Sequence, residues 1–177
     1  MLPRLTLVFG GAASGKSMLA EELVTRHGGG RVYLASAQAF DAEMSAKIAR
    51  HLGQRGPDWR TVEAPLDVAT PLGSVSKSEV VLFDCATLWL SNHMLAEADI
   101  DAQTDILLAA LARCAGPVVV VSNELGMGIV PENALARRFR DAHGRLNQRL
   151  AAQADLVVLV AAGLPLTLKG QLPEAAT

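Results

Sequence analysis

Short apolar runs alternate along the chain with longer stretches in which apolar residues recur every three or four positions. The clearest runs are 5–9, 31–35, 80–84, 117–122 and 155–160. Runs of this length between turn signals are typical of buried strands, and the longer periodic stretches are typical of helices. Their alternation predicts an α/β fold with a mainly parallel central sheet, built as a single domain over residues 1–177.

The remaining elements follow from the same pattern. Further strands are predicted at 58–63 and 164–169, helices at 18–26, 41–52, 88–97 and 101–114, and a weak helix within 64–76. A long helix is predicted to open at Pro131, because a proline loses no helical hydrogen bond at the first position, and to run to about Ala152. Its predicted apolar stripe is Leu135, Phe139, Leu146 and Leu150. Residues 170–177 are predicted to form a loose tail.

Composition excludes several classes of protein. The chain has 177 residues, of which 50% are hydrophobic, and a formal net charge of −2. It therefore lacks the basic field typical of nucleic-acid binding, and no apolar run approaches the roughly 18–20 residues that span a membrane. Cys85 and Cys114 lie far apart in apolar surroundings. We interpret them as reduced packing residues, which favours a cytoplasmic protein.

The turn after the first run carries the strongest chemical signal. The phosphate-loop pattern G-x-x-x-x-G-K-[ST] is matched by Gly10-Gly11-Ala12-Ala13-Ser14-Gly15-Lys16-Ser17, between a predicted strand and a predicted helix. We expect the three glycines to take backbone angles closed to other residues, so that successive N–H groups and the helix N-terminus face a phosphate. Lys16 then reaches the β- and γ-phosphates, and Ser17 offers its hydroxyl to a phosphate-bound Mg²⁺.

Polar residues at two other strand ends add to this site. The run 80–84 ends in Asp84, and an apolar strand ending in aspartate is the expected partner of a phosphate loop, beside which it holds Mg²⁺ directly or through water. The alternative is an ordinary strand-end aspartate that caps the next helix. Ser36-Ala37-Gln38 follows the second strand, at a carboxyl end of the sheet where α/β proteins place ligands.

His51 has two interpretations on the residues alone. It lies just before a Gly/Pro break and close to Arg50 and Arg55. A neutral imidazole is able to attack phosphorus and hold it covalently, which splits one difficult transfer into two. The alternative is a histidine that packs against the core or caps its helix, since histidine has many uses besides catalysis.

A row of arginines on the long helix is equally open. Arg138, Arg145 and Arg149 are spaced by seven and four residues, which places them on one helix face. The row is either a solvated face with an Asp141–Arg145 pair or a surface that meets phosphates.

Several stretches taken together resemble one family. They are the phosphate loop, Asp41-Ala42-Glu43-Met44 through Ile48 to His51, Trp59-Arg60-Thr61-Val62-Glu63, residues 84–92, residues 122–131 (Ser-Asn-Glu-Leu-Gly-Met-Gly-Ile-Val-Pro) and Arg140-Asp141 with 144–148. Over residues 5–169 the chain resembles the bifunctional adenosylcobinamide kinase / adenosylcobinamide-phosphate guanylyltransferases of cobalamin biosynthesis. The phosphate loop is common to many families, whereas the blocks at 41–51 and 122–131 are far more specific.

The resemblance implies a fold and two reactions. The fold is of the P-loop NTPase type, three-layered and RecA-like. The γ-phosphate of ATP or GTP passes to the aminopropanol hydroxyl of adenosylcobinamide, and GTP then gives GMP to the resulting phosphate, which forms adenosylcobinamide-GDP and pyrophosphate. The second reaction passes through a histidine-linked GMP, and the matching histidine is His51. The family also implies a homo-oligomer, a trimer, for which Trp89 and its neighbours are a candidate contact.

The resemblance also implies a residue set. Lys16 and His51 are the implied catalytic residues, and Ser17 and Asp84 the implied Mg²⁺ ligands. The implied nucleotide contacts are residues 10–17, Ser36, Ala37, Gln38, Leu52, Gly53, Gln54, Arg55, Glu63 and Asp84. Asp84 replaces a glutamate of some relatives, which shortens its reach to a metal, and Ala13 replaces a frequent arginine, which removes one phosphate contact.

Two other function classes fit the residues alone. One is a phosphate-loop kinase of another small molecule, in which His51 is purely structural and no covalent nucleotide forms. The other is a nucleotide-binding regulatory or scaffold protein, which binds GTP or ATP and at most hydrolyses it slowly.

Overall fold

The computed structural model describes residues 1–37 and 58–173. Its strands are β1 (Leu5–Gly10), β2 (Gly30–Ala35), β3 (Trp59–Glu63), β4 (Glu79–Asp84), β5 (Val118–Asn123), β6 (Leu156–Ala161) and β7 (Leu164–Lys169). Its helices are α1 (Lys16–His27), α3 (Ala69–Gly73), α4 (Ala86–Leu95), α5 (Ile100–Arg113) and α6 (Ala134–Gln153). These elements confirm the predicted α/β order, while the predicted helix 41–52 lies outside the described residues.

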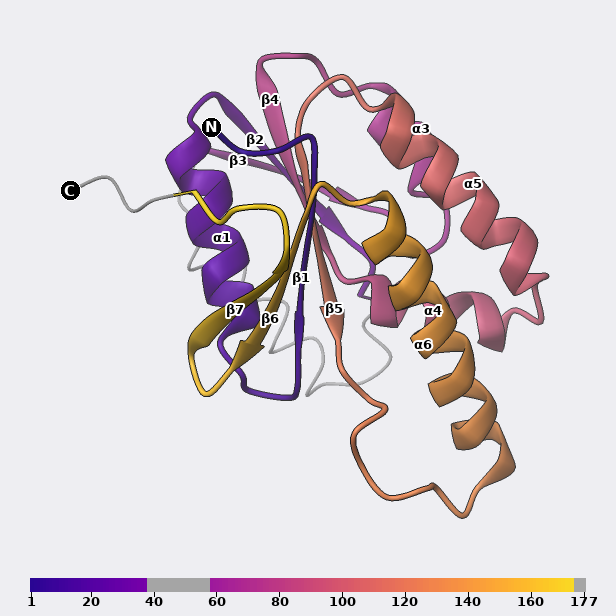
Figure 1. Cartoon of the computed structure of the whole chain (residues 1–177). Helices are drawn as coiled ribbons and strands as arrows, with labels where there is room; N and C mark the ends of the chain where they lie inside the picture. Colours follow the sequence, from indigo (N-terminus) through magenta and orange to yellow (C-terminus); the bar gives the residue numbers. More distant parts are fainter. Residues whose placement is uncertain (38–57, 174–177) are drawn as a thin grey trace.

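The described strands form one sheet in the order β3-β2-β4-β5-β1-β6-β7. All neighbours are parallel except β6 and β7, which are antiparallel. Gly10 pairs in register with Asn123, and Ala35 pairs with Asp84. The carboxyl ends of the parallel strands therefore meet at one edge of the sheet, where the phosphate loop begins (Figure 1).

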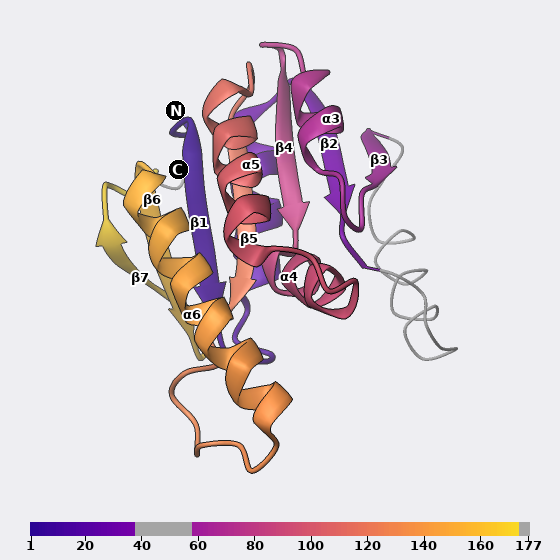
Figure 2. The same ribbon diagram turned by 90° about the vertical axis from the view of Figure 1, so that its right-hand side faces the viewer.

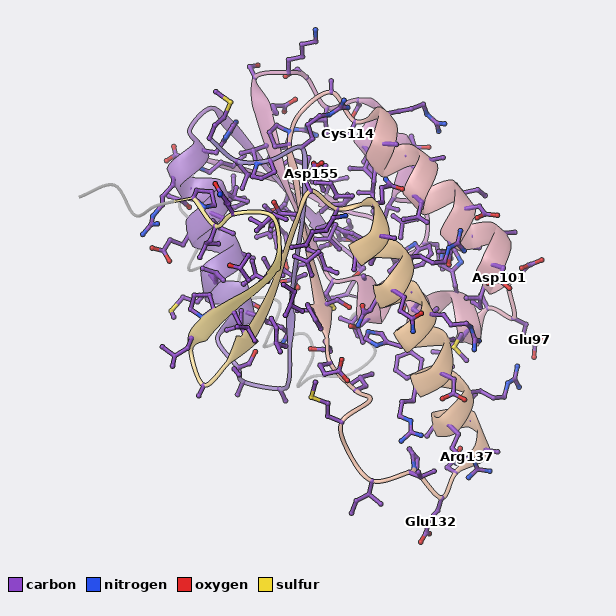
Figure 3. The ribbon with its side chains drawn as sticks, viewed as in Figure 1. Glu97, Asp101, Cys114, Glu132, Arg137 and Asp155 are labelled. Atoms are coloured by element: carbon purple, nitrogen blue, oxygen red, sulfur yellow. The ribbon has the colours of Figure 1, made fainter. Side chains whose placement is uncertain are left out.

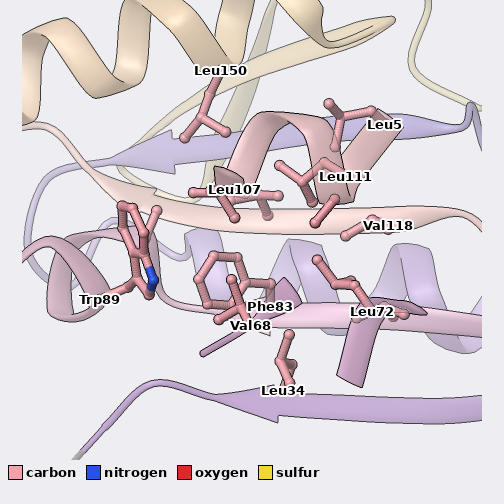
Figure 4. Packing of buried hydrophobic residues seen from close by; sticks show 14 of the residues in the cluster. Leu5, Leu34, Val68, Leu72, Phe83, Trp89, Leu107, Leu111, Val118 and Leu150 are labelled. Atoms are coloured by element: carbon pink, nitrogen blue, oxygen red, sulfur yellow. The ribbon is translucent and has the colours of Figure 1, made fainter. Parts of the chain in front are cut away.

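Helices cover both faces of the sheet, which confirms the three-layer class. On one face α1 packs Ala20, Leu23 and Val24 into a cluster with inward residues of the strands. On the other face lie α3, α4, α5 and α6, seen in front of the sheet in Figure 2. Figure 4 shows part of this second core, where Phe83 of β4 lies near Trp89 of α4.

Trp89 is a core residue in this chain. It is 1% exposed, its indole N–H donates to the carbonyl of Leu66 at 2.9 Å, and its ring meets that of His93 at 4.5 Å between centroids. His93 is itself buried, with Nε2 3.2 Å from the same carbonyl oxygen. Both side chains therefore fasten α4 to the segment before α3.

The start of α6 differs from the prediction. The helix begins at Ala134 rather than Pro131, because the side chain of Asn133 accepts hydrogen bonds from the backbone N–H groups of Leu135 and Ala136 at 2.8 and 3.1 Å. Leu135 is 56% exposed and is not part of the core stripe, since the first turn of α6 extends beyond the sheet (Figure 2).

The C-terminal segment also differs in part from the predicted loose tail. Leu172 is half-buried and packs against the core cluster that contains residues of α1.

In the described ranges, no helix combines the length and apolar character that crossing a membrane requires.

Glu79 fixes the turn before β4. Its carboxylate accepts the backbone N–H of Ser76 at 2.8 Å and the Ser76 hydroxyl at 3.0 Å, and Arg60 of β3 donates to its other oxygen at 2.9 Å. The Ser76 backbone bond, followed by Arg60 and the Ser76 hydroxyl, lowers the pKa of Glu79 from 4.5 to about 2.

We expect Glu79→Gln to weaken the fold at neutral pH and to lose this effect in acid. A carboxyl group with a depressed pKa stabilises the fold above its unfolded value, and that stability is lost as pH falls through the folded value. The urea midpoints of wild type and variant should therefore differ at pH 7 and converge between pH 4.5 and about 2. Glu132→Gln, on the exposed segment before α6, controls for loss of one negative charge. A gap that stays constant with pH would contradict the assignment.

Candidate nucleotide site

The phosphate loop is held in shape by its own backbone. Gly15 caps α1 in the left-handed region with φ of 95°, and Ala13 also has a positive φ of 55°. The N–H of Ser14 donates to the carbonyl of Gly11 at 3.3 Å, and Gly163, in the β6–β7 turn, donates its N–H to the carbonyl of Ser14 at 2.9 Å. The loop is therefore braced by the neighbouring hairpin.

The three loop glycines are needed for different reasons, which corrects the expectation that all take unusual angles. A Cβ built at Gly10 would lie 2.3 Å from the carbonyl oxygen of Val160, so this position needs glycine for close backbone approach. Gly15 needs its left-handed angle. Gly11 has no such angle, and among the described residues no atom lies within 4 Å of a Cβ built there.

Lys16 and the start of α1 make the loop electropositive. The ammonium of Lys16 lies on the loop and donates to the Gly11 carbonyl at 3.1 Å. The first turn of α1, which the structure describes throughout, has no acidic residue to offset the helix dipole. Ser17 follows Lys16 in that turn and is half-buried. A helix N-terminus and a lysine in one glycine-rich loop are an arrangement suited to binding an anion such as a phosphate.

Asp84 stands farther from the loop than the sequence suggests. β5 lies between β1 and β4, so the strand that ends in Asp84 is roughly 10 Å from that of the loop at the usual strand spacing. The phenolic O–H of Tyr33, on β2, donates to Asp84 Oδ2 at 2.7 Å. This hydrogen bond orients the carboxylate at the edge of the sheet, a contact that sequence reasoning missed.

The intervening strand delivers Asn123 and Glu124 between the loop and Asp84. The backbone N–H of Glu124 donates to the carbonyl of Gly10 at 2.9 Å, which ties the end of β5 to the loop. The backbone N–H of Asn123 donates to Thr87 Oγ1 at 2.9 Å, and its carbonyl accepts from Asn147 Nδ2 at 2.9 Å. The turn is thus fixed from both α4 and α6.

A buried histidine sits at the centre of these contacts. His143 of α6 is 1% exposed, and its Nε2 lies 3.0 Å from Thr87 Oγ1 and 3.2 Å from Ser122 Oγ. Ser122 Oγ in turn donates to Asn147 Oδ1 at 2.6 Å. Burial lowers the pKa of His143, against a smaller opposing effect of the Glu124 carboxylate. Through its contacts with Thr87 and Ser122, the His143 ring joins α4, β5 and α6.

The other predicted nucleotide contacts are buried between strands, far from the loop, or outside the described residues. Ser36 is fully buried, and its hydroxyl both donates to the Cys85 carbonyl at 2.7 Å and accepts from the Cys85 N–H at 2.8 Å, so in this conformation it joins β2 to β4. Ala37 is half-buried beside it. Glu63 is exposed on β3, four strands from β1 and roughly 19 Å away at normal spacing. Gln38, His51 and 52–55 lie outside the described residues.

The arginine row of α6 is largely balanced by carboxylates. Arg149 pairs with Asp105 of α5, and the Asp141–Arg145 pair of the solvated-face alternative is not among the ion pairs of the described residues. Arg138 and Arg145 line an open cleft of about 240 Å³ whose walls also carry Asp99, Asp101 and Asp141. Three carboxylates on the same walls offset the two guanidinium groups, which favours the solvated-face interpretation.

Comparisons with a family model and with known proteins all point to the same family. A family model described as cobinamide kinase / cobinamide phosphate guanyltransferase matches residues 6–168. The chain is 43% identical over 168 residues to the bifunctional adenosylcobalamin biosynthesis protein CobP of Pseudomonas aeruginosa, which covers 93% of this chain and 97% of that protein. It is 41% identical over 181 residues to CobU of Salmonella typhimurium, with 93% and 99% covered.

Solved structures show the same fold at much lower sequence identity. A protein of Pyrococcus horikoshii OT3 matches with a TM-score of 0.58 at 8% identity, over 96% of this chain and 87% of that one. The fold likeness agrees with the sheet and layers described above. The family model and the relatives above 40% identity establish that the chain belongs to the cobinamide kinase / cobinamide phosphate guanyltransferase family.

Proposed function

We propose that this chain carries out both reactions of its family: phosphorylation of adenosylcobinamide with ATP or GTP, and transfer of GMP from GTP to adenosylcobinamide phosphate. The observation that carries the proposal is the family match over residues 6–168, which includes the formed phosphate loop. The family resemblance further supports a cytoplasmic homo-oligomer, a trimer.

In the kinase reaction the aminopropanol oxygen attacks the γ-phosphorus. The bond from that phosphorus to the β–γ bridging oxygen breaks, the nucleoside diphosphate leaves, and the hydroxyl proton passes to a base or to solvent. This chemistry asks mainly for positioning and for stabilisation of charge. Lys16 and the N–H groups of the loop offset the charge that develops on the phosphate oxygens.

The oxygen donors at this end of the sheet fit a magnesium ion. Mg²⁺ prefers oxygen ligands, and Ser17 and Asp84 offer a hydroxyl and a carboxylate. When bound, the ion neutralises charge shared by the β- and γ-phosphates. Tyr33 orients the Asp84 carboxylate through its 2.7 Å hydrogen bond, as partners of metal ligands commonly do.

In the transferase reaction His51 is the nucleophile. Its ring nitrogen attacks the α-phosphorus of GTP, the bond to the α–β bridging oxygen breaks, and pyrophosphate leaves. A phosphate oxygen of adenosylcobinamide phosphate then displaces the histidine nitrogen and forms adenosylcobinamide-GDP. The role of His51, like those of Gln38 and 52–55, rests on the family resemblance.

A labelling experiment tests the transferase half. The protein is incubated with Mg²⁺ and GTP labelled on the α-phosphate, then denatured in alkali. We expect an alkali-stable, acid-labile label on the chain that disappears in His51→Ala, because a phosphoramidate survives base and is cleaved by acid. His27→Ala, at the end of α1, is the matched control and should keep the label.

The outcomes separate the function classes. If folded, GTP-binding wild type takes no label but phosphorylates adenosylcobinamide, the histidine intermediate is wrong and a kinase remains. If it binds nucleotide but transfers nothing, a binding protein is the better interpretation.

A further inference from the structure

The segment between β5 and α6 exposes apolar side chains beside the nucleotide site. Residues 125–131 carry no charge. Within them Met127 is 80% exposed, Ile129 97% and Val130 60%. In Figures 1 and 2 this segment extends away from the sheet at the end where the phosphate loop lies. Neighbouring exposed apolar side chains of this kind commonly mark a binding surface.

The two ends of the segment are held by hydrogen bonds. At its start the Glu124 carboxylate accepts the N–H of Gly126, while the Glu124 N–H is bound to the Gly10 carbonyl at 2.9 Å. At its end Arg137 donates from Nη1 to the carbonyls of Pro131, at 2.9 Å, and Glu132. Arg137 and Glu132 lie together where the segment meets α6 (Figure 3). The apolar side chains are therefore presented from a segment anchored at both ends.

The strand order places the start of this segment next to the phosphate loop. Lys16 follows β1 and Asp84 ends β4, and β5 runs between these strands. A phosphate bound between Lys16 and Asp84 therefore lies over the end of β5, from which the segment departs. The attacking hydroxyl must approach that phosphorus to about 3–3.5 Å. The rest of the acceptor then extends outward past the segment.

We propose that Met127, Ile129 and Val130 form the contact surface for the corrin ring of the acceptor. This inference rests on the proposed function. A corrin is a broad ring with apolar faces and methyl groups, attached to the arm that bears the hydroxyl. Apolar side chains without charge complement such a face, and its amide arms remain in solvent.

Equilibrium binding tests the proposal. Adenosylcobinamide is titrated into the full-length protein with a non-hydrolysable ATP analogue bound, and the Kd is followed by corrin absorbance after dialysis. We expect Ile129→Ser with Val130→Ser to raise this Kd about tenfold or more, since two apolar contacts are lost. The Kd of the ATP analogue, the melting temperature and the oligomer mass should not change.

Leu168→Ser is the matched control. Leu168 is 56% exposed and lies near the end of β7, which pairs with the start of β6. It is therefore at the end of the sheet opposite the phosphate loop. It should leave both dissociation constants unchanged. Met127→Ser provides a second, independent variant of the surface.

The possible failures are distinguishable. If wild type binds adenosylcobinamide and the variants bind it equally well, the surface assignment is overturned and the proposed function stands. If the variants change the oligomer mass, the surface is an interface with a second copy, which also overturns the assignment. If wild type does not bind adenosylcobinamide, the proposed function fails and this inference fails with it.

Discussion

Lys16→Ala is expected to lower kcat for phosphoryl transfer to adenosylcobinamide by about 10²–10³-fold or more, the usual effect of removing one charge-stabilising group from a transition state. Negative charge on the bridging and terminal oxygens of the nucleotide increases as the γ-phosphoryl group is transferred. The ammonium of Lys16 already lies on the loop, 3.1 Å from the Gly11 carbonyl, so it meets that charge with little reorganisation.

The measurement is steady-state kinetics with saturating nucleotide, alongside thermal unfolding. The free energy of unfolding should change by no more than about 1 kcal/mol, because one partly exposed hydrogen bond to a carbonyl is lost. Lys77→Ala is the matched control, since Lys77 is exposed in the turn before β4, at the end of the strands opposite the phosphate loop. A variant that binds nucleotide more weakly but keeps its kcat would show that Lys16 binds ground state and transition state equally.

The sequence predicted local structure well because each strand has a clear local signal. The runs ending at Asp84 and preceding the phosphate loop lie within one or two residues of β4 and β1. Strand order is a different matter, since no local pattern says that β5 inserts between them. The distance from the loop to Asp84, and the location of Glu63 at the far edge, depend on that order and so could not be predicted from apolar runs.

His143 was missed although a signal was present. Phe139, His143, Leu146 and Leu150 are spaced by four, three and four residues, so a histidine occupies a position of the apolar stripe. A polar residue at a core position needs a partner, and Thr87 and Ser122 are its partners. Leu135 was assigned to the stripe because helical spacing does not reveal where a helix extends beyond its sheet. Ser36 shows that a polar residue at a strand end also bonds to backbone, here that of Cys85, and its contact with a nucleotide stays a prediction.

Gly10→Ala and Gly11→Ala are expected to differ sharply although they stand side by side in the phosphate loop. A Cβ at Gly10 would lie 2.3 Å from the Val160 carbonyl oxygen and 2.7 Å from Ser14 Oγ, so β1 and β6 must separate or the loop must shift. We expect Gly10→Ala to lower the free energy of unfolding by about 3 kcal/mol, the upper range for overpacking. For a chain of this size that corresponds to a fall in melting temperature of roughly 10 °C.

Gly11→Ala should leave the melting temperature of the ligand-free protein unchanged or slightly higher. Its backbone angle is open to alanine, and the described residues leave space for the added methyl group. Thermal unfolding without nucleotide isolates this comparison from any contact with phosphate. Equal melting temperatures for the two variants would mean that the β6 backbone does not constrain the loop. A difference in the expected direction would show that the close approach of Gly10 to the Val160 carbonyl constrains the loop, so that β6 helps to set the shape of the phosphate site.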